Sequence, residues 1–208
     1  MDSKEFVDKL WDEIMEEQEK REKNISLQDA ETEELPEHVI KHWLNFAVYY
    51  EKAATHFIGG WLKTTKESDA LVNFAYQIED EANHYMWLGK HLKDYVDDID
   101  AFEPPKEWRY LMEEYYPGLD HLVERLAAHN IASESAVLGF MEFALERFPE
   151  PIRQTVERVS KDEKFHVSFG RTLLKKYCTT PELQERAYKA TKEAMKLMKE
   201  ARGVFVQI

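Results

Sequence analysis

Cysteine is almost absent from this sequence, since Cys178 is its one thiol among 208 residues. No disulfide can form within the chain, and cysteine-based zinc or iron–sulfur sites are excluded. Glycine and proline are also scarce, with seven residues of each, and they cluster between long periodic segments. This distribution favours helices over sheets and turns.

Long apolar runs are missing as well, and positive charge is in short supply. No uninterrupted apolar run approaches the roughly 18–20 residues of a membrane span, and the first twenty residues are charged throughout, unlike a signal peptide. With 28 basic and 41 acidic residues, the net charge is −13, which disfavours nucleic acid and anionic lipid as partners. We therefore expect a cytoplasmic protein with no membrane and no nucleic-acid partner.

What is present is helical periodicity, and an apolar content of 43% predicts a packed core. We expect an all-α fold, a ferritin-like four-helix bundle with a long crossover between helices 2 and 3 and extra helices at both ends. The whole chain, 1–208, is expected to be one domain. Its parts are an N-terminal helix and linker (1–36), a first helical hairpin (37–98), a crossover (99–118), a second hairpin (119–177) and a C-terminal helix (181–202).

Breakers and caps set the expected helix limits. The ranges are 3–23, 37–66, 68–98 with Ser68 as cap, a short helix ending near 116, then 119–147, 151–177 with Pro151 in the first turn, and 181–202 capped by Thr180. Residues 24–36 are expected to be a polar linker, and the last six residues, GVFVQI, receive no assignment.

The informative feature is an internal repeat. Residues 80–84 read Asp-Glu-Ala-Asn-His and residues 162–166 read Asp-Glu-Lys-Phe-His. Glu and His at positions i and i+3 share one helix face and can reach one ion. One copy is common by chance in a Glu-rich helical protein, but two copies at matching places predict one shared site.

Hairpin geometry brings a further Glu to each motif. Glu51 and Glu81 are thirty residues apart, so a turn near residue 66 sets them level at the ends of two arms, each about 22 Å long. Glu134 and Glu163 are related in the same way about the turn at residues 148–149. Pro, Ser and charge alone place these turns, so this agreement is independent of the motif.

Glu51 is also the lone carboxylate between His38 and Lys66, on an otherwise apolar stripe. Glu134 has similar apolar neighbours. A buried, unpaired carboxylate costs several kcal/mol, and four such groups in one core would repel each other. Two metal cations would remove that repulsion.

The ligand types indicate which metal. Four carboxylates and two imidazoles suit iron or manganese, whereas structural zinc prefers more thiolate and imidazole, and calcium avoids imidazole. We expect two iron ions, Fe/Fe or Mn/Fe. The expected metal ligands, which are also the expected catalytic residues, are Glu51, Glu81, His84, Glu134, Glu163 and His166. Glu81 and Glu163 would bridge, and Asp80 and Asp162 would each reach the His of the opposite hairpin.

The order Glu, Glu-x-x-His, Glu, Glu-x-x-His over residues 37–177 resembles the ferritin-like di-iron carboxylate superfamily. The Asp-Glu-x-x-His form is similar to its oxygenase branch, which includes bacterial multicomponent monooxygenases, acyl-carrier desaturases, phenylacetyl-CoA oxygenase subunits and arylamine oxygenases. This resemblance implies iron at the six ligands and O2-dependent oxidation of a small organic substrate. It also implies an electron-donor protein as a partner, and we expect a homodimer.

Several features separate the chain from other members of the superfamily. It lacks the cysteines of a rubrerythrin electron-transfer domain, and Leu88 stands where ribonucleotide reductase small subunits carry a radical Tyr. Two alternatives remain open: iron handling without an organic substrate, and a structural bundle whose buried acids are paired with basic residues. The remaining histidines, His129 among them, are expected in surface or core roles, as are aromatic residues near the motifs and Cys178.

Overall fold

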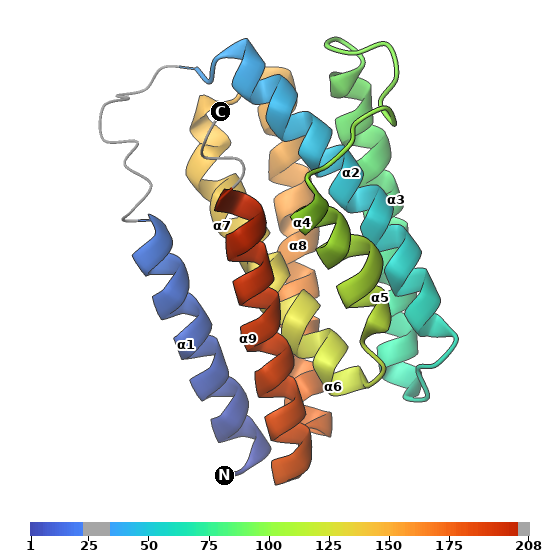
Figure 1. The fold of residues 1–208 in the computed structure, drawn as a ribbon, viewed down its shortest axis with the longest axis vertical. Helices are drawn as coiled ribbons and strands as arrows, with labels where there is room; N and C mark the ends of the chain where they lie inside the picture. Colours follow the sequence, from blue (N-terminus) through green and yellow to red (C-terminus); the bar gives the residue numbers. More distant parts are fainter. Residues whose placement is uncertain (23–33, 204–208) are drawn as a thin grey trace.

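The computed structural model of the chain describes residues 1–22 and 34–203, and these residues form seven continuous helical segments and no strand (Figure 1). The all-α expectation is therefore confirmed. In chain order the elements are α1 (Ser3–Glu22), α2 (Glu37–Leu62), α3 (Ser68–Leu92), α4 (Lys106–Arg109), η1 (Tyr110–Tyr115), α5 (Tyr116–Gly118), α6 (Leu122–Arg125), η2 (Leu126–Ser133), α7 (Glu134–Ala144), η3 (Leu145–Arg147), α8 (Glu150–Tyr177) and α9 (Pro181–Gly203).

Two of these segments are composite. The elements α4, η1 and α5 run on as one crossover segment, and α6, η2, α7 and η3 form one long rod. Both η1 and η2 are π-helical, with backbone hydrogen bonds from i to i+5 instead of i+4. Sequence periodicity did not predict either π-helix.

The long helices pack in contiguous pairs. α2 packs against α3, and α8 packs against η2, α7 and α3. α9 lies along η2 and α6, α1 lies against α8 and α9, and the crossover segment lies beside α2 (Figure 1). The buried apolar side chains form two clusters, one toward each end of α2, with residues such as Phe57 in the first and Leu44 in the second.

α2 is shorter than expected, ending at Leu62 instead of Lys66. The end is fixed by the Arg125 side chain, which donates hydrogen bonds to the Trp61 carbonyl and to the hydroxyls of Thr64 and Thr65. Both threonine hydroxyls also donate to the Trp61 carbonyl. Because these side chains donate to the Trp61 carbonyl in the last turn, that carbonyl needs no further helical N–H, and the helix ends there. The turn at 63–67 still lies where the hairpin argument placed it.

α3 was also predicted too long, since it ends at Leu92 and not at Asp98. Asp94, Asp97 and Asp98 follow its last turn, and acidic groups at a helix C-terminus interact unfavourably with the helix dipole. The expected cap was misplaced by one position. Glu67 occupies the N-cap position without a side-chain cap hydrogen bond, and Ser68 is the first helical residue.

The crossover and the third rod differ from expectation at their junction. Helix α5 includes Pro117 and ends at Gly118, two residues beyond the predicted break. The rod then begins at Leu122, not at residue 119, because His121 forms a capping box. Its Nδ1 accepts from the Val123 N–H, while the Glu124 carboxylate accepts from the His121 N–H.

Several other boundaries are confirmed. Pro151 lies in the first turn of α8, and the Thr180 hydroxyl accepts from the Leu183 N–H at the start of α9. Cys178 is buried, as expected. Residues 24–33 of the predicted linker, and all of the tail except Gly203, lie outside the described residues.

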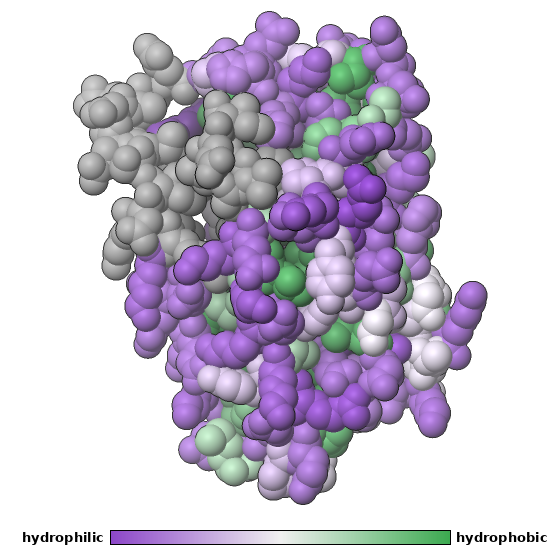
Figure 2. Space-filling model, in the orientation of Figure 1, coloured by the Kyte–Doolittle hydropathy of each residue, from purple (hydrophilic) through white to green (hydrophobic). Residues whose placement is uncertain are grey.

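No helix in 1–22 or 34–203 combines the length and apolarity needed to cross a membrane. The face shown in Figure 2 is mainly hydrophilic, with small hydrophobic patches between polar side chains. This agrees with the acidic, polar composition.

Candidate metal centre

Four helical rods bring the six predicted ligands into one buried cluster. Glu51 comes from α2, Glu81 and His84 from α3, Glu134 from the first position of α7, and Glu163 and His166 from α8. None of these side chains is more than 1% exposed. Their ligand atoms fall into two groups that could each hold an ion, namely Glu51, Glu81, His84 and Glu163, and Glu81, Glu134 and His166.

Two of the carboxylates lie between the two imidazoles. Glu81 places Oε2 3.4 Å from Nδ1 of His84 and Oε1 3.6 Å from Nδ1 of His166. Glu163 places Oε1 3.4 Å from Nδ1 of His84 and Oε2 3.3 Å from Nδ1 of His166. Each therefore presents one oxygen to each side, which is the arrangement that bridging ligands need.

The other two carboxylates lie at opposite sides of the cluster. Oε2 of Glu51 is 3.5 Å from Nδ1 of His84, and Glu134 groups with Glu81 and His166. The apolar stripe predicted around Glu51 is also present, with Leu44, Ala54 and Ile58 fully buried. One carboxylate therefore lies on each side of the pair formed by Glu81 and Glu163.

Several cluster atoms are buried without a hydrogen-bond partner among the described residues. They are Oε2 of Glu51, Oε2 of Glu81, Nδ1 of His84, Oε2 of Glu134 and Oε1 of Glu163. A buried acceptor left without a partner costs about 1–3 kcal/mol. Five buried atoms without partners, distributed over the two groups of ligand atoms, therefore fit metal ions, which accept electron pairs from such atoms.

The structural alternative, in which basic residues pair with these acids, finds no support in the described part of the chain. The ion-pair partners of the four carboxylates there are histidines, with no Lys or Arg within 4.0 Å.

Each histidine contacts an aspartate from the opposite hairpin, through the ring nitrogen that faces away from the cluster. His84 Nε2 lies 3.3 Å from Asp162 Oδ2, and His166 Nε2 lies 3.2 Å from Asp80 Oδ2. An N–H donated from Nε2 to each aspartate leaves the Nδ1 lone pair directed at the cluster. This contact was predicted from the sequence. The side chains of Asp80 and Asp162 are 29% and 33% exposed, so on this face only the aspartates lie between the histidines and solvent.

Metal-free, the cluster must balance its charge with protons. Burial raises the pKa of Glu51 and of Glu134 well above the usual range, so both favour the neutral acid. Burial acts in the same direction on Glu163, but its close contacts with Glu134, His166 and His84 outweigh burial and lower the pKa of Glu163. Burial disfavours a charged His166, yet hydrogen bonds with Asp80 and Glu163 raise its pKa to about 10.

Amide side chains that the sequence analysis did not identify extend the network. Gln77 Nε2 donates to Glu81 Oε1 at 2.9 Å and to Glu134 Oε1 at 3.3 Å. Asn130 Nδ2 in turn donates to Gln77 Oε1 at 2.8 Å. Gln77 stands one helical turn before Glu81, and that i, i+4 spacing was the available signal.

His129 is buried in the core, one of the two roles expected for it, but its contact with Glu134 was not predicted. Its Nε2 lies 2.9 Å from Glu134 Oε1 and 3.3 Å from the Tyr50 hydroxyl. Burial lowers the pKa of His129 to about 4, so the ring is neutral, and we assign its N–H to Nε2, where it can donate to Glu134. The i, i+5 spacing of His129 and Glu134 does not share a face in an α-helix, but it does in the π-helix η2.

Aromatic rings enclose His129. The rings of Phe57, Tyr116 and Trp61 lie 4.9, 5.3 and 5.8 Å from it, centroid to centroid. On the other side of the centre, Trp87 lies 5.7 Å from His84 and carries the Arg158 guanidinium over its face. These rings cover His129 and one side of His84 with apolar surface.

Comparison with protein-family models, curated proteins and solved structures found no match for this chain.

Proposed function

We propose that this chain is a non-haem di-iron oxidoreductase of ferritin-like architecture. It would activate O2, or peroxide, to oxidise a small organic substrate. The observation that supports the proposal best is the buried ligand set, in which Glu81 and Glu163 each present one oxygen to both histidines. Asp80 and Asp162, crossed between the hairpins, add the outer contacts usual for metal-bound histidine.

Charge supports two ions of iron type. Four carboxylates balance two divalent cations, and Asp80 and Asp162 can offset added positive charge if the ions become trivalent. Carboxylate and imidazole together suit iron, with a mixed Mn/Fe pair as the close variant.

The protein's own groups would prepare the centre for this chemistry. Bound iron supplies coordination positions and electrons for the reduction of O2. Asp80 and Asp162 hold the histidine protons at Nε2, while Gln77 and His129 orient the carboxylates of Glu81 and Glu134. The burial of the six side chains would limit the access of bulk water to the reacting atoms. Electrons would come from a donor protein, and a homodimer is the proposed assembly.

Metal analysis of the purified protein tests the proposal. We expect two iron ions per chain after anaerobic loading, and much less in Glu81→Ala and His166→Ala. Glu79→Gln is the matched control, because Glu79 is an exposed acid on the same helix. Iron content equal in all four proteins would refute the assigned ligands. Oxygen uptake by the reduced, loaded protein, absent from the two ligand variants, tests the redox role.

One observation favours a second candidate, iron handling by ferroxidation. The groove described below has none of the six ligands in its lining. A centre that admits only iron and O2 would suit ferroxidation. Gel filtration and single-turnover loading separate the two candidates. A large cage that accumulates ferric mineral as iron leaves the centre supports iron handling. A dimer that retains its iron at the centre and consumes a co-substrate supports the oxidase.

A further inference from the structure

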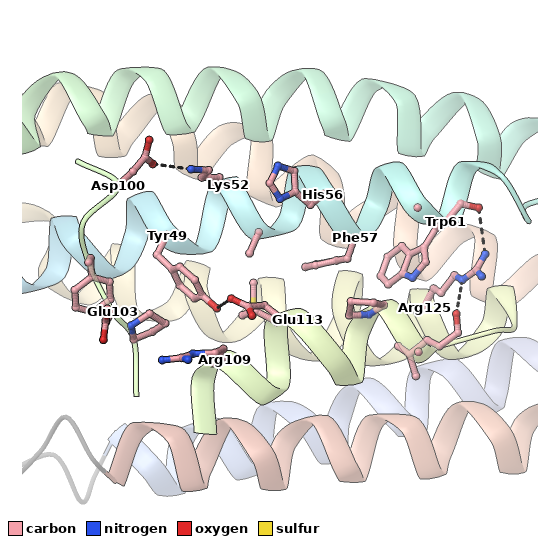
Figure 3. Close-up of a pocket in the computed structure, with 18 of the residues that line it drawn as sticks. Tyr49, Lys52, His56, Phe57, Trp61, Asp100, Glu103, Arg109, Glu113 and Arg125 are labelled. Atoms are coloured by element: carbon pink, nitrogen blue, oxygen red, sulfur yellow. Dashed lines mark hydrogen bonds and ion pairs between the residues drawn. The ribbon is translucent and has the colours of Figure 1, made fainter. Parts of the chain in front are cut away.

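A groove with a cavity volume of about 810 Å³ runs between α2 and the crossover segment (Figure 3). Its size falls within the range of small-molecule sites, roughly 300–1,000 Å³. Its lining extends along α2 from Tyr49 to Trp61, which corresponds to about 18 Å of helix, and continues to Thr64 in the turn that follows. The opposite wall comes from the loop after α3 and from the crossover segment, with Phe102 and Met112 among its residues.

The middle of the groove is apolar and open. Ala53, Phe57 and Met112 line it, all nearly buried. Gly60 also lines it, and a Cβ built there meets no atom within 4 Å. Tyr49 and Phe102 add aromatic surface at one end, with ring centroids 6.3 Å apart. A flat or extended apolar molecule would be in contact with rings and small side chains along this length.

The charged groups of the groove are mostly engaged with protein partners. Lys52 pairs with Asp100 at 2.9 Å, Asp120 pairs with Arg186 at 2.5 Å, and Glu113 accepts from the Tyr49 hydroxyl at 3.1 Å. The labelled side chains in Figure 3 show the first and last of these pairs at the same end.

Arg125 is similarly occupied, since it makes five hydrogen bonds, to the carbonyls of Leu119, Trp61 and Asp120 and to the hydroxyls of Thr64 and Thr65. The two lining charges without a hydrogen bond or ion pair in the described residues are then Arg109 and Glu103. They are opposite in sign and both exposed.

We infer that this groove is a binding site for a neutral, elongated, mainly aromatic small molecule. Arg109 and Glu103 are exposed to water, and the apolar middle of the groove, lined by Ala53, Phe57, Gly60 and Met112, holds no charged side chain. A charged ligand lying there would be desolvated without a compensating partner, at a cost of several kcal/mol. Binding there needs none of the six metal ligands, so the groove is a second site. Phe57 forms the partition between the two sites, because it lines the groove while its ring packs on His129, which contacts Glu134.

Two fluorescent probes with the same aromatic body test the inference. N-phenyl-1-naphthylamine is neutral, and 8-anilinonaphthalene-1-sulfonate carries one negative charge. We expect the neutral probe to bind the full-length protein saturably, one per chain, and the sulfonate to bind at least about tenfold more weakly.

Adjacent glycines provide the matched variants. Gly60→Phe places a ring in the groove and should weaken neutral-probe binding by at least about tenfold. Gly59→Phe should leave it within about twofold, because Gly59 does not line the groove and its Cβ position is equally open. Thermal unfolding of both variants checks that each is folded.

Three outcomes would overturn the inference: no saturable binding by wild type, equal effects of the two substitutions, or sulfonate binding as tight as that of the neutral probe. Glu81→Ala should keep probe binding while it loses iron. If the wild type binds iron but not the probe, the groove inference fails and the metal centre stands. If the wild type binds the probe but not iron, the metal centre fails and the groove inference stands.

Discussion

Crossed histidine–aspartate contacts set the orientation of both imidazoles in the centre. Asp80→Asn and Asp162→Asn would keep the size of each side chain but weaken the acceptor for the Nε2–H of His166 and His84. Loss of such a partner usually costs 10–100-fold in metal affinity, so we expect weakening of about that size in each variant. Competition with a chromophoric chelator measures it. Affinity equal to that of Glu79→Gln would contradict the role given to these aspartates.

His129 positions Glu134 from the opposite direction. In His129→Leu, Oε1 of Glu134 would lose its 2.9 Å contact with His129 and keep its 3.3 Å contact with Gln77, so the carboxylate would be held less firmly. We expect lower metal affinity and an altered iron absorption spectrum. His129→Gln, which retains a donor, should recover part of both. If the leucine variant binds iron with unchanged affinity and spectrum, His129 is only a packing residue.

Proton release should accompany metal binding. The pKa of His166 is raised from 6.5 to about 10, so at neutral pH the metal-free imidazole holds a proton that an ion must displace. Apparent affinity should therefore rise between about pH 7 and pH 9, by up to about tenfold per pH unit for each proton released. Titrations at several pH values and in weak buffer measure both quantities. A flat profile with no released protons would contradict the protonated metal-free state.

The sequence was sufficient to predict that these six side chains and the two aspartates come together, because their spacing obeys α-helical periodicity. Glu81 and His84 lie at i and i+3, and the turn at 63–67 sets Glu51 level with them. His129 could not be found by the same reasoning. Residues i and i+5, such as His129 and Glu134, share a helix face only in a π-helix such as η2. No simple propensity rule predicts a π-helix from the sequence.

At the scale of elements, helix ends were the least predictable feature. Periodicity continued past Leu62 and Leu92, but tertiary contacts and a run of aspartates ended α2 and α3 there. Arg125, 63 residues after Leu62 in the sequence, caps α2, and no local pattern reveals such a partner. The turns of both hairpins nevertheless lie where the sequence predicted them. Glu51 therefore still lies level with Glu81, and Glu134 with Glu163.

Close packing between α8 and η2 depends on Gly170. A Cβ built there would lie 2.6 Å from Asn130 Cβ and 3.5 Å from the Asn130 carbonyl carbon, so Gly170→Ala must push the two elements apart. We expect a loss of about 1–3 kcal/mol in the free energy of unfolding and weaker iron binding, because Asn130 supports Gln77. Urea unfolding monitored by circular dichroism and metal titration measure these effects.

Gly59→Ala is the matched control for that substitution. Its Cβ would meet nothing within 4 Å, and the change relieves the poor helix propensity of glycine inside α2. We expect a gain of up to about 1 kcal/mol and unchanged iron binding. Equal effects of the two substitutions would argue against a close α8–η2 contact.

For the whole molecule, the buried carboxylates connect metal binding to stability. Without metal the centre keeps protons on Glu51 and Glu134 and leaves five polar atoms without hydrogen bonds, all of which opposes folding. Ligands that bind only the folded state stabilise it, by about 2.7 kcal/mol per site at a free concentration of one hundred times Kd. Iron should therefore raise the melting temperature, and a chelator should reverse the increase.

Replacing one buried acid distinguishes the stability that comes from bound iron from the stability that comes from helix packing. In Glu51→Gln the metal-free protein should be at least as stable as wild type, because a neutral amide occupies the place of an acid that burial already keeps protonated. The same variant should gain much less stability from iron, since it lacks one terminal ligand. Calorimetric scans with and without iron test both halves. A variant that is destabilised without metal and still fully stabilised by iron would show that Glu51 holds the helices together rather than the ions.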